Sequence, residues 1–74
     1  MNKTEFLEEL KNALNTQKEL SPDMELNALE EWDSLSIAFV ISLFSDNFNI
    51  NLTYDEIGKF KTIQDLLDKA GIKE

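Results

Sequence analysis

An apolar stripe at helical spacing opens the chain. Its members recur three or four positions apart with polar residues between them, and they are Phe6, Leu7, Leu10, Ala13 and Leu14. Asn2 precedes the stripe as an N-cap residue would, and Glu5 follows it at the spacing of a capping box. The pattern predicts a first helix over about residues 3–15.

Residues 16–33 break the helical pattern and contain the only proline of the chain. Ser21-Pro22-Asp23 is a turn signal within this segment. Apolar residues still recur along it, namely Leu20, Met24, Leu26, Leu29 and Trp32. The segment is therefore predicted to be a long loop that lies across the core, and loops of this length are often functional.

The next stretch, "LSIAFVISLFSDNF", is the most apolar part of the chain. Asp33 or Ser34 is predicted to cap a second helix here, which runs to about residue 47. Its apolar residues cover more than one side: Leu35, Ile37, Ala38, Val40, Ile41, Leu43, Phe44 and Phe48. A helix this apolar is expected at the centre of the fold, in contact with several neighbours.

Two further capping-box patterns occur in the last third of the chain. Thr53 with Glu56 predicts a short third helix over about residues 54–59, and Thr62 with Asp65 predicts a fourth. Ile63, Leu66, Leu67 and Ala70 would give that fourth helix its apolar side, and Gly71 would end it. The predicted fold is all-α: a four-helix bundle with a short third helix and a long loop between helices one and two.

The composition excludes several kinds of functional site. The 74 residues are enough for one small domain, predicted to span 1–74, and they include neither Cys nor His. Disulfides, zinc fingers, iron–sulfur sites, a Ser-His-Asp triad and a thiol nucleophile are therefore excluded. An enzyme is not expected, because so small a core leaves little room for a catalytic cleft.

The charge points to a protein partner. Fifteen acidic residues face seven basic ones, all lysine, for a formal net charge of −8. Such a surface is a poor match for nucleic acid and is repelled by anionic membranes, whereas a partner with a basic face would be attracted. Solubility alone is the simpler explanation. The longest apolar run, "IAFVI", is too short to span a membrane, and no signal peptide is seen, so a cytoplasmic monomer is expected.

The motif "EEWDSLS" places Ser34 at the predicted start of the second helix. A helix N-terminus presents free N–H groups and the positive end of the helix dipole, so a phosphate attached to this serine would be stabilised. Asp-Ser before an apolar run is also an ordinary helix cap, and the tripeptide alone favours that interpretation.

The wider pattern resembles acyl carrier proteins and related carrier domains that bear phosphopantetheine. The resemblance is closest from Trp32 to Leu67 and extends by pattern to the first helix. It is carried by Asp33-Ser34-Leu35, an apolar helix that ends in Phe48, Leu52 after a short link, the acidic pair Asp55-Glu56, and Thr62-Ile63 at the last helix. Asp-Ser-Leu alone has low specificity, whereas the whole set is specific.

The resemblance implies that a phosphopantetheinyl transferase attaches 4′-phosphopantetheine to Ser34. The arm's thiol would carry an acyl group as a thioester, between a loading ligase and an acyltransferase or synthase. Asp33 would position the attachment site, or would be a plain N-cap, and Leu35 would anchor the helix start in the core. The alternatives are an aminoacyl or peptidyl carrier and, outside the family, a cofactor-free acidic helical adaptor that docks a basic protein.

The family also implies an acyl pocket and a partner surface. The matching pocket positions are Ile37, Val40, Ile41, Phe44, Leu52, Ile57, Phe60 and Leu66, any of which could equally be ordinary core. The bulk of Phe44 and Phe60 predicts a short or polar cargo. The expected partner surface comprises Ser36, Phe39, Ser42, Asp46, Asp55 and Glu56.

The second helix departs from the family, in which this helix is usually acidic. Asp46 is its one acidic residue between Leu35 and Phe48, and Phe39 falls on the face expected to meet solvent. Phe39 either folds back onto the surface or provides an aromatic docking contact, since aromatic residues are favoured at interface hot spots. The departure favours a specialised pathway over the usual enzymes of fatty acid biosynthesis.

Overall fold

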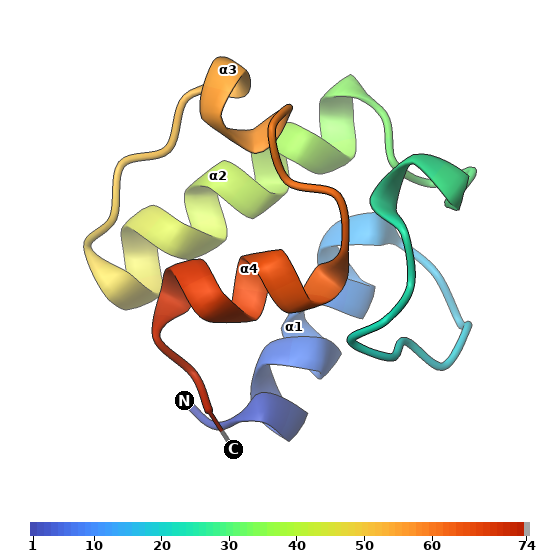
Figure 1. Cartoon of the computed structure of the whole chain (residues 1–74), viewed down its shortest axis with the longest axis horizontal. Helices are drawn as coiled ribbons and strands as arrows, with labels where there is room; N and C mark the ends of the chain where they lie inside the picture. Colours follow the sequence, from blue (N-terminus) through green and yellow to red (C-terminus); the bar gives the residue numbers. More distant parts are fainter. Residues whose placement is uncertain (74) are drawn as a thin grey trace.

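Four helices and one 3-10 turn make up the fold in the computed structural model, which describes residues 1–73 (Figure 1). The elements are α1 (Lys3–Leu14), a 3-10 turn (Leu26–Ala28), α2 (Ser34–Phe48), α3 (Tyr54–Ile57) and α4 (Ile63–Ala70). The predicted all-α bundle, with a short third helix and a long gap between α1 and α2, is confirmed. The ends differ from the predicted ones by one or two residues, which is the usual uncertainty of helix ends.

Side-chain caps decide where the helices begin. The Asn2 carboxamide oxygen accepts the Glu5 backbone N–H over 2.8 Å, and the Glu5 carboxylate accepts the Asn2 N–H over 3.0 Å. Thr53 with Glu56 and Thr62 with Asp65 form the same reciprocal pairs at α3 and α4. All three predicted capping boxes are thus confirmed, and they satisfy N–H groups that no helical bond can reach.

Left-handed residues end three of the helices. Asn15 (φ 54°) follows α1, Asn49 (φ 56°) follows α2 and Gly71 (φ 78°) follows α4, as predicted for the glycine. Asparagine and glycine tolerate this backbone region better than other residues, so each position gives a sharp stop.

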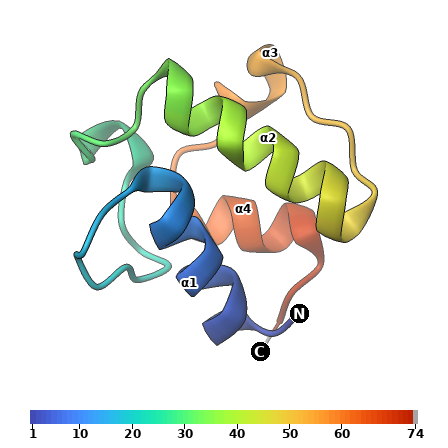
Figure 2. The same cartoon turned by 180° about the vertical axis from the view of Figure 1, so that it is seen from behind.

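The core lies where α1, α2 and α4 meet, and α3 closes one end (Figures 1 and 2). The helix–helix contact between α1 and α2 is the most extensive. Phe6 of α1 meets Phe44 of α2 edge to face, with ring centroids 5.9 Å apart, and Phe48 lies 5.5 Å from Phe44. The fully buried large side chains are Phe6, Leu10, Leu26, Val40, Phe44, Ile57, Ile63, Leu66 and Leu67.

The loop between α1 and α2 is tied to the start of α4. Glu25 and Thr62 form an isolated antiparallel bridge, and the Leu26 N–H donates to the Lys61 carbonyl over 2.8 Å. The Ile63 N–H donates to the Met24 carbonyl over 3.0 Å. Leu26 is fully buried beneath this contact, so the prediction that the loop lies across the core is confirmed. Within residues 1–73, no helix is both long enough and apolar enough to cross a membrane.

Candidate functional site

Asp33 is the residue that caps α2. Its backbone is extended, and its carboxylate accepts the Ser36 backbone N–H over 2.9 Å. That N–H, with a smaller contribution from the N–H of Leu35, lowers the pKa of the Asp33 carboxyl below its ordinary value against a smaller opposing effect of desolvation. The sequence left Asp33 and Ser34 as alternative caps, and the structure assigns the role to Asp33.

Ser34 is consequently the first residue of the helix and is exposed to solvent. Among residues 1–73, no group forms a hydrogen bond with its hydroxyl. Ser34 belongs to the first turn of α2, where free backbone N–H groups and the helix dipole favour a negative charge. The hydroxyl is therefore accessible at a position that is electrostatically suited to a phosphate ester.

Glu31 joins the loop to the start of α2. Its carboxylate accepts the Thr16 hydroxyl over 3.0 Å and lies 3.3 Å from the Lys18 ammonium, while its carbonyl accepts the Ser36 hydroxyl over 2.6 Å. Hydrogen bonds from its own backbone N–H and from Thr16 lower the pKa of the Glu31 carboxyl. Sequence reasoning missed this cluster, because the partners of Glu31 lie 5 to 15 residues away in sequence and all members except Ser36 belong to an irregular loop.

The expected burial of Leu35 is wrong, because the helix is turned differently from the expected phase. Leu35 is 67% exposed and does not anchor the helix start. Ser36, in contrast, is only 6% exposed, and whether it contacts a partner stays a prediction. Residues four apart share a helix face, so Ser36 lies in line with Val40 and Phe44 on the buried side. Leu35 is left on the side of Phe39, which is 53% exposed, as expected for the solvent face.

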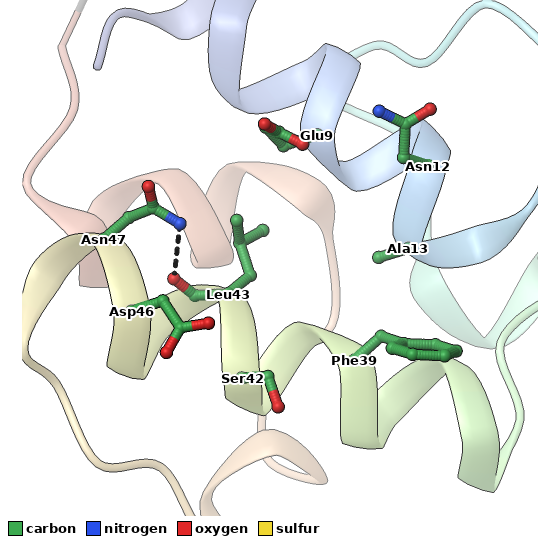
Figure 3. A pocket seen from close by; sticks show the side chains of 8 residues that line it. All are labelled: Glu9, Asn12, Ala13, Phe39, Ser42, Leu43, Asp46 and Asn47. Atoms are coloured by element: carbon green, nitrogen blue, oxygen red, sulfur yellow. Dashed lines mark hydrogen bonds between the residues drawn. The ribbon is translucent and has the colours of Figure 1, made fainter.

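A shallow groove runs between α1 and α2, and we refer to it as the α1–α2 groove. It consists of two hollows of about 340 and 500 Å³ that share Asn12, Ala13 and Phe39. One hollow reaches Asp33, Leu35 and Ser36 beside Ser34, and the other continues along α2 past Ser42 and Leu43 to Asp46 and Asn47. Figure 3 shows Glu9, Asn12 and Ala13 of α1 opposite the residues of α2. The structure thus brings together three predicted partner residues, Phe39, Ser42 and Asp46.

The remaining predicted partner residues lie on α3, outside the α1–α2 groove. Asp55 is exposed there. Glu56 is half-buried, and its carboxylate accepts the Thr53 backbone N–H over 3.1 Å. Glu56 therefore has a structural role at the start of α3, and whether either residue contacts a partner stays a prediction.

The eight predicted pocket residues all belong to the core or pack against it. Val40, Phe44, Leu52, Ile57 and Leu66 are buried, whereas Ile37, Ile41 and Phe60 are partly buried. None of these eight residues lines either hollow of the α1–α2 groove or the two hollows beside Thr4 and Glu8 of α1. They act as ordinary core in this conformation, and a cargo pocket among them stays a prediction that requires the helices to part.

A resident metal ion finds no donor cluster in the described chain. Glu30, Glu31 and Asp33 are close in sequence, yet no group of three or more potential ligand side chains gathers within residues 1–73. Hard cations such as Ca²⁺ need six to eight oxygen ligands, so this segment does not supply a site.

In comparisons with known proteins, no family model, curated protein or solved structure matches the chain.

Proposed function

We propose that the chain is a carrier protein that bears 4′-phosphopantetheine on Ser34 and holds an acyl or aminoacyl group on the arm as a thioester. One observation carries the proposal: the Ser34 hydroxyl is exposed and unbonded at the N-terminus of α2, because Asp33 provides the cap in its place. A serine that only capped the helix would hold a backbone N–H with its own oxygen.

The surroundings of Ser34 fit a phosphodiester-linked arm. The flanking side chains of Asp33 and Leu35 are exposed and leave the hydroxyl open to a transferase. The N–H groups of the first turn of α2 favour the phosphate, and the Glu31 contacts to Thr16 and Ser36 hold the attachment segment against the fold. The arm would supply the thiol that a chain without cysteine lacks.

The chain itself would be a substrate and shuttle for other proteins, not an enzyme. A phosphopantetheinyl transferase would attach the arm, a ligase would load it, and an acyltransferase or synthase would receive the cargo. The net charge of −8 favours partners with basic docking faces. The exposed Phe39, where an acidic residue was expected, favours a specialised cytoplasmic pathway.

Intact-mass measurement tests the attachment site. The full chain is incubated with coenzyme A and a broad-specificity phosphopantetheinyl transferase, beside the variants Ser34→Ala and Ser45→Ala. Ser45 is the matched control because it is an exposed serine on the same helix and lies outside the predicted partner surface. We expect a gain of one phosphopantetheine in the native chain and in Ser45→Ala, and none in Ser34→Ala.

A native chain that gains no mass with several transferases would overturn the carrier proposal. Far-UV circular dichroism of each sample guards against unfolding as the cause. In that outcome the exposed Phe39 and the acidic surface would belong to a cofactor-free adaptor, which is the alternative that the sequence left open.

A further inference from the structure

We infer that the α1–α2 groove receives the arm on Ser34 and selects a small cargo that carries an ammonium group, as in an aminoacyl thioester. The inference rests on the proposed function and deepens it by naming the class of cargo. Three features of the structure carry it: a closed core, a groove that begins beside Ser34, and the charge of the groove's rim.

The core gives a long acyl chain no ready space. Val40 and Phe44 are both 0% exposed, and Phe44 packs against the rings of Phe6 and Phe48. A chain that entered here would have to separate well-packed side chains, and overpacking a core is destabilising. The described hollows lie at the surface instead, which favours a cargo small and polar enough to stay there.

The groove leads away from Ser34 along α2. Asp33, Leu35 and Ser36 line its near end, Phe39 and Ala13 its middle, and Leu43 and Asp46 its far end. By the helix rise, Ser34 and Asp46 are separated by about 18 Å along the axis. An extended arm built from two amide units and their methylene groups covers a distance of this order, so its end would reach the far hollow.

The lining matches the chemistry of such an arm. Leu35, Phe39 and Ala13 offer apolar surface to its methylene and methyl groups. Asn12 and Asn47 offer carboxamide groups to its amides (Figure 3). The Asn47 side chain already donates one hydrogen bond to the Leu43 carbonyl over 3.0 Å, which fixes its orientation.

Acidic side chains alone provide the charge of the groove. Glu9 of α1 and Asp46 of α2 lie on the two sides of the far hollow, while Glu31 and Asp33 line the near one (Figure 3). No lysine lines either hollow, but the Lys18 ammonium lies 3.3 Å from Glu31 and offsets its charge, so the rim charge comes mainly from Glu9, Asp46 and Asp33. An ammonium at the end of the arm is attracted by this rim, whereas a neutral acyl group gains nothing from it.

Nuclear magnetic resonance of two matched loaded forms tests the inference. The full chain is loaded on Ser34 with amide-linked, hydrolysis-resistant pantetheine analogues that carry either an alanyl or a propionyl group. The two cargoes differ only by the ammonium. We expect the alanyl form to shift the amide signals of Ala13, Phe39 and Leu43 more than the propionyl form does, and this difference to shrink at high salt.

Variants of the rim supply the control. Glu9→Gln with Asp46→Asn should reduce the alanyl shifts to the propionyl level, and unchanged signals of the buried Ile57 and Leu66 would show that the fold persists. Equal shifts for both cargoes, shifts at Ile57 and Leu66 in place of the groove, or no shifts at all would overturn the inference. If neither loaded form shifts any signal, the groove would be free to bind a basic segment of a partner protein instead. A chain that cannot be loaded on Ser34 would overturn the proposed function itself, and this inference with it.

Discussion

The two faces of α2 carry similarly apolar residues but differ in burial. Val40 and Phe44 are completely buried, whereas Leu35 and Phe39 are more than half exposed although they are just as apolar. The difference arises from the neighbours, because the inner face meets the rings of Phe6 and Phe48. The outer face lies beside the small Ala13 and the polar Asn12. Apolarity alone therefore does not identify the core of this domain.

The inner face holds the fold and the outer face is free for function. Large apolar side chains on a solvent face add nothing to the core, and exposed aromatic residues are typical of docking surfaces. Ser34 lies at the start of the helix, exposed beside Leu35. Ser34 itself lines neither hollow of the α1–α2 groove, so a cargo would reach the outer face only through the length of its arm.

The largest expected effect separates the two phenylalanines of α2. Phe44→Ala should lower the free energy of unfolding by about 3–5 kcal/mol, because it removes a fully buried ring from the aromatic cluster. Phe39→Ala should change it by no more than about 0.5 kcal/mol, as for an ordinary surface substitution. Urea denaturation followed by circular dichroism measures the change for every variant that still folds.

The native stability sets the limit of this comparison. A domain of this length has a core worth only about 3–5 kcal/mol, so Phe44→Ala should be largely unfolded without denaturant. Phe44→Leu is the milder variant that keeps the measurement quantitative. A loss in Phe39→Ala as large as that in Phe44→Leu would contradict the assignment of the two faces.

The serines of α2 repeat the comparison on a smaller scale. Ser36→Ala should cost about 1 kcal/mol, because the Glu31 carbonyl loses the hydroxyl that it accepts over 2.6 Å. Ser42→Ala should be neutral or stabilising by up to about 0.5 kcal/mol, since alanine is the better helix former at an exposed position. Thermal and urea denaturation distinguish the two, and equal losses would refute the inward role of Ser36.

The local parts of this structure were predictable from the sequence. Capping boxes such as Asn2 with Glu5 act within one helical turn, so their residue types and spacing are enough to place the helix starts. The stop at Gly71 follows from the same local chemistry. Ser34 was singled out differently, by the resemblance of the whole stretch from Trp32 to Leu67, because the local tripeptide alone favours an ordinary helix cap.

The parts that depend on tertiary packing were not predictable. The rotation of α2 decides whether Leu35 or Ser36 is buried, and an apolar pattern that covers most of the helix leaves this rotation open. The contacts of Glu31 with Thr16 and Lys18 need a loop conformation that no periodicity describes. The hollow beside Phe39 depends on which residue of α1 lies opposite, and here that residue is Ala13.

The smallest expected effect concerns Asp33, which connects the two faces. Its carboxylate lines the α1–α2 groove and accepts the N–H of the inward-facing Ser36. Because folding lowers the pKa of this carboxyl, its charge stabilises the native state above the unfolded-state pKa of about 3.9. The contribution is lost as the pH falls through the lower pKa of the folded state. Asp33→Asn keeps a capping oxygen and removes the charge.

The difference in unfolding free energy between the native chain and Asp33→Asn should therefore depend on pH. We expect it to be largest above about pH 5 and to vanish once the pH lies below both pKa values of Asp33. Urea denaturation from about pH 2 to 7 measures it, and about 0.15 M salt limits the repulsion among the other carboxylates.

Asp65→Asn is the matched variant, because the Asp65 carboxylate accepts the Lys61 and Thr62 N–H groups before α4 and its pKa is also lowered. Its loss should follow the same pH course and add to that of Asp33→Asn, since the two caps belong to different helices. A difference for Asp33→Asn that does not change with pH would show that the carboxylate acts by shape alone, as an uncharged cap.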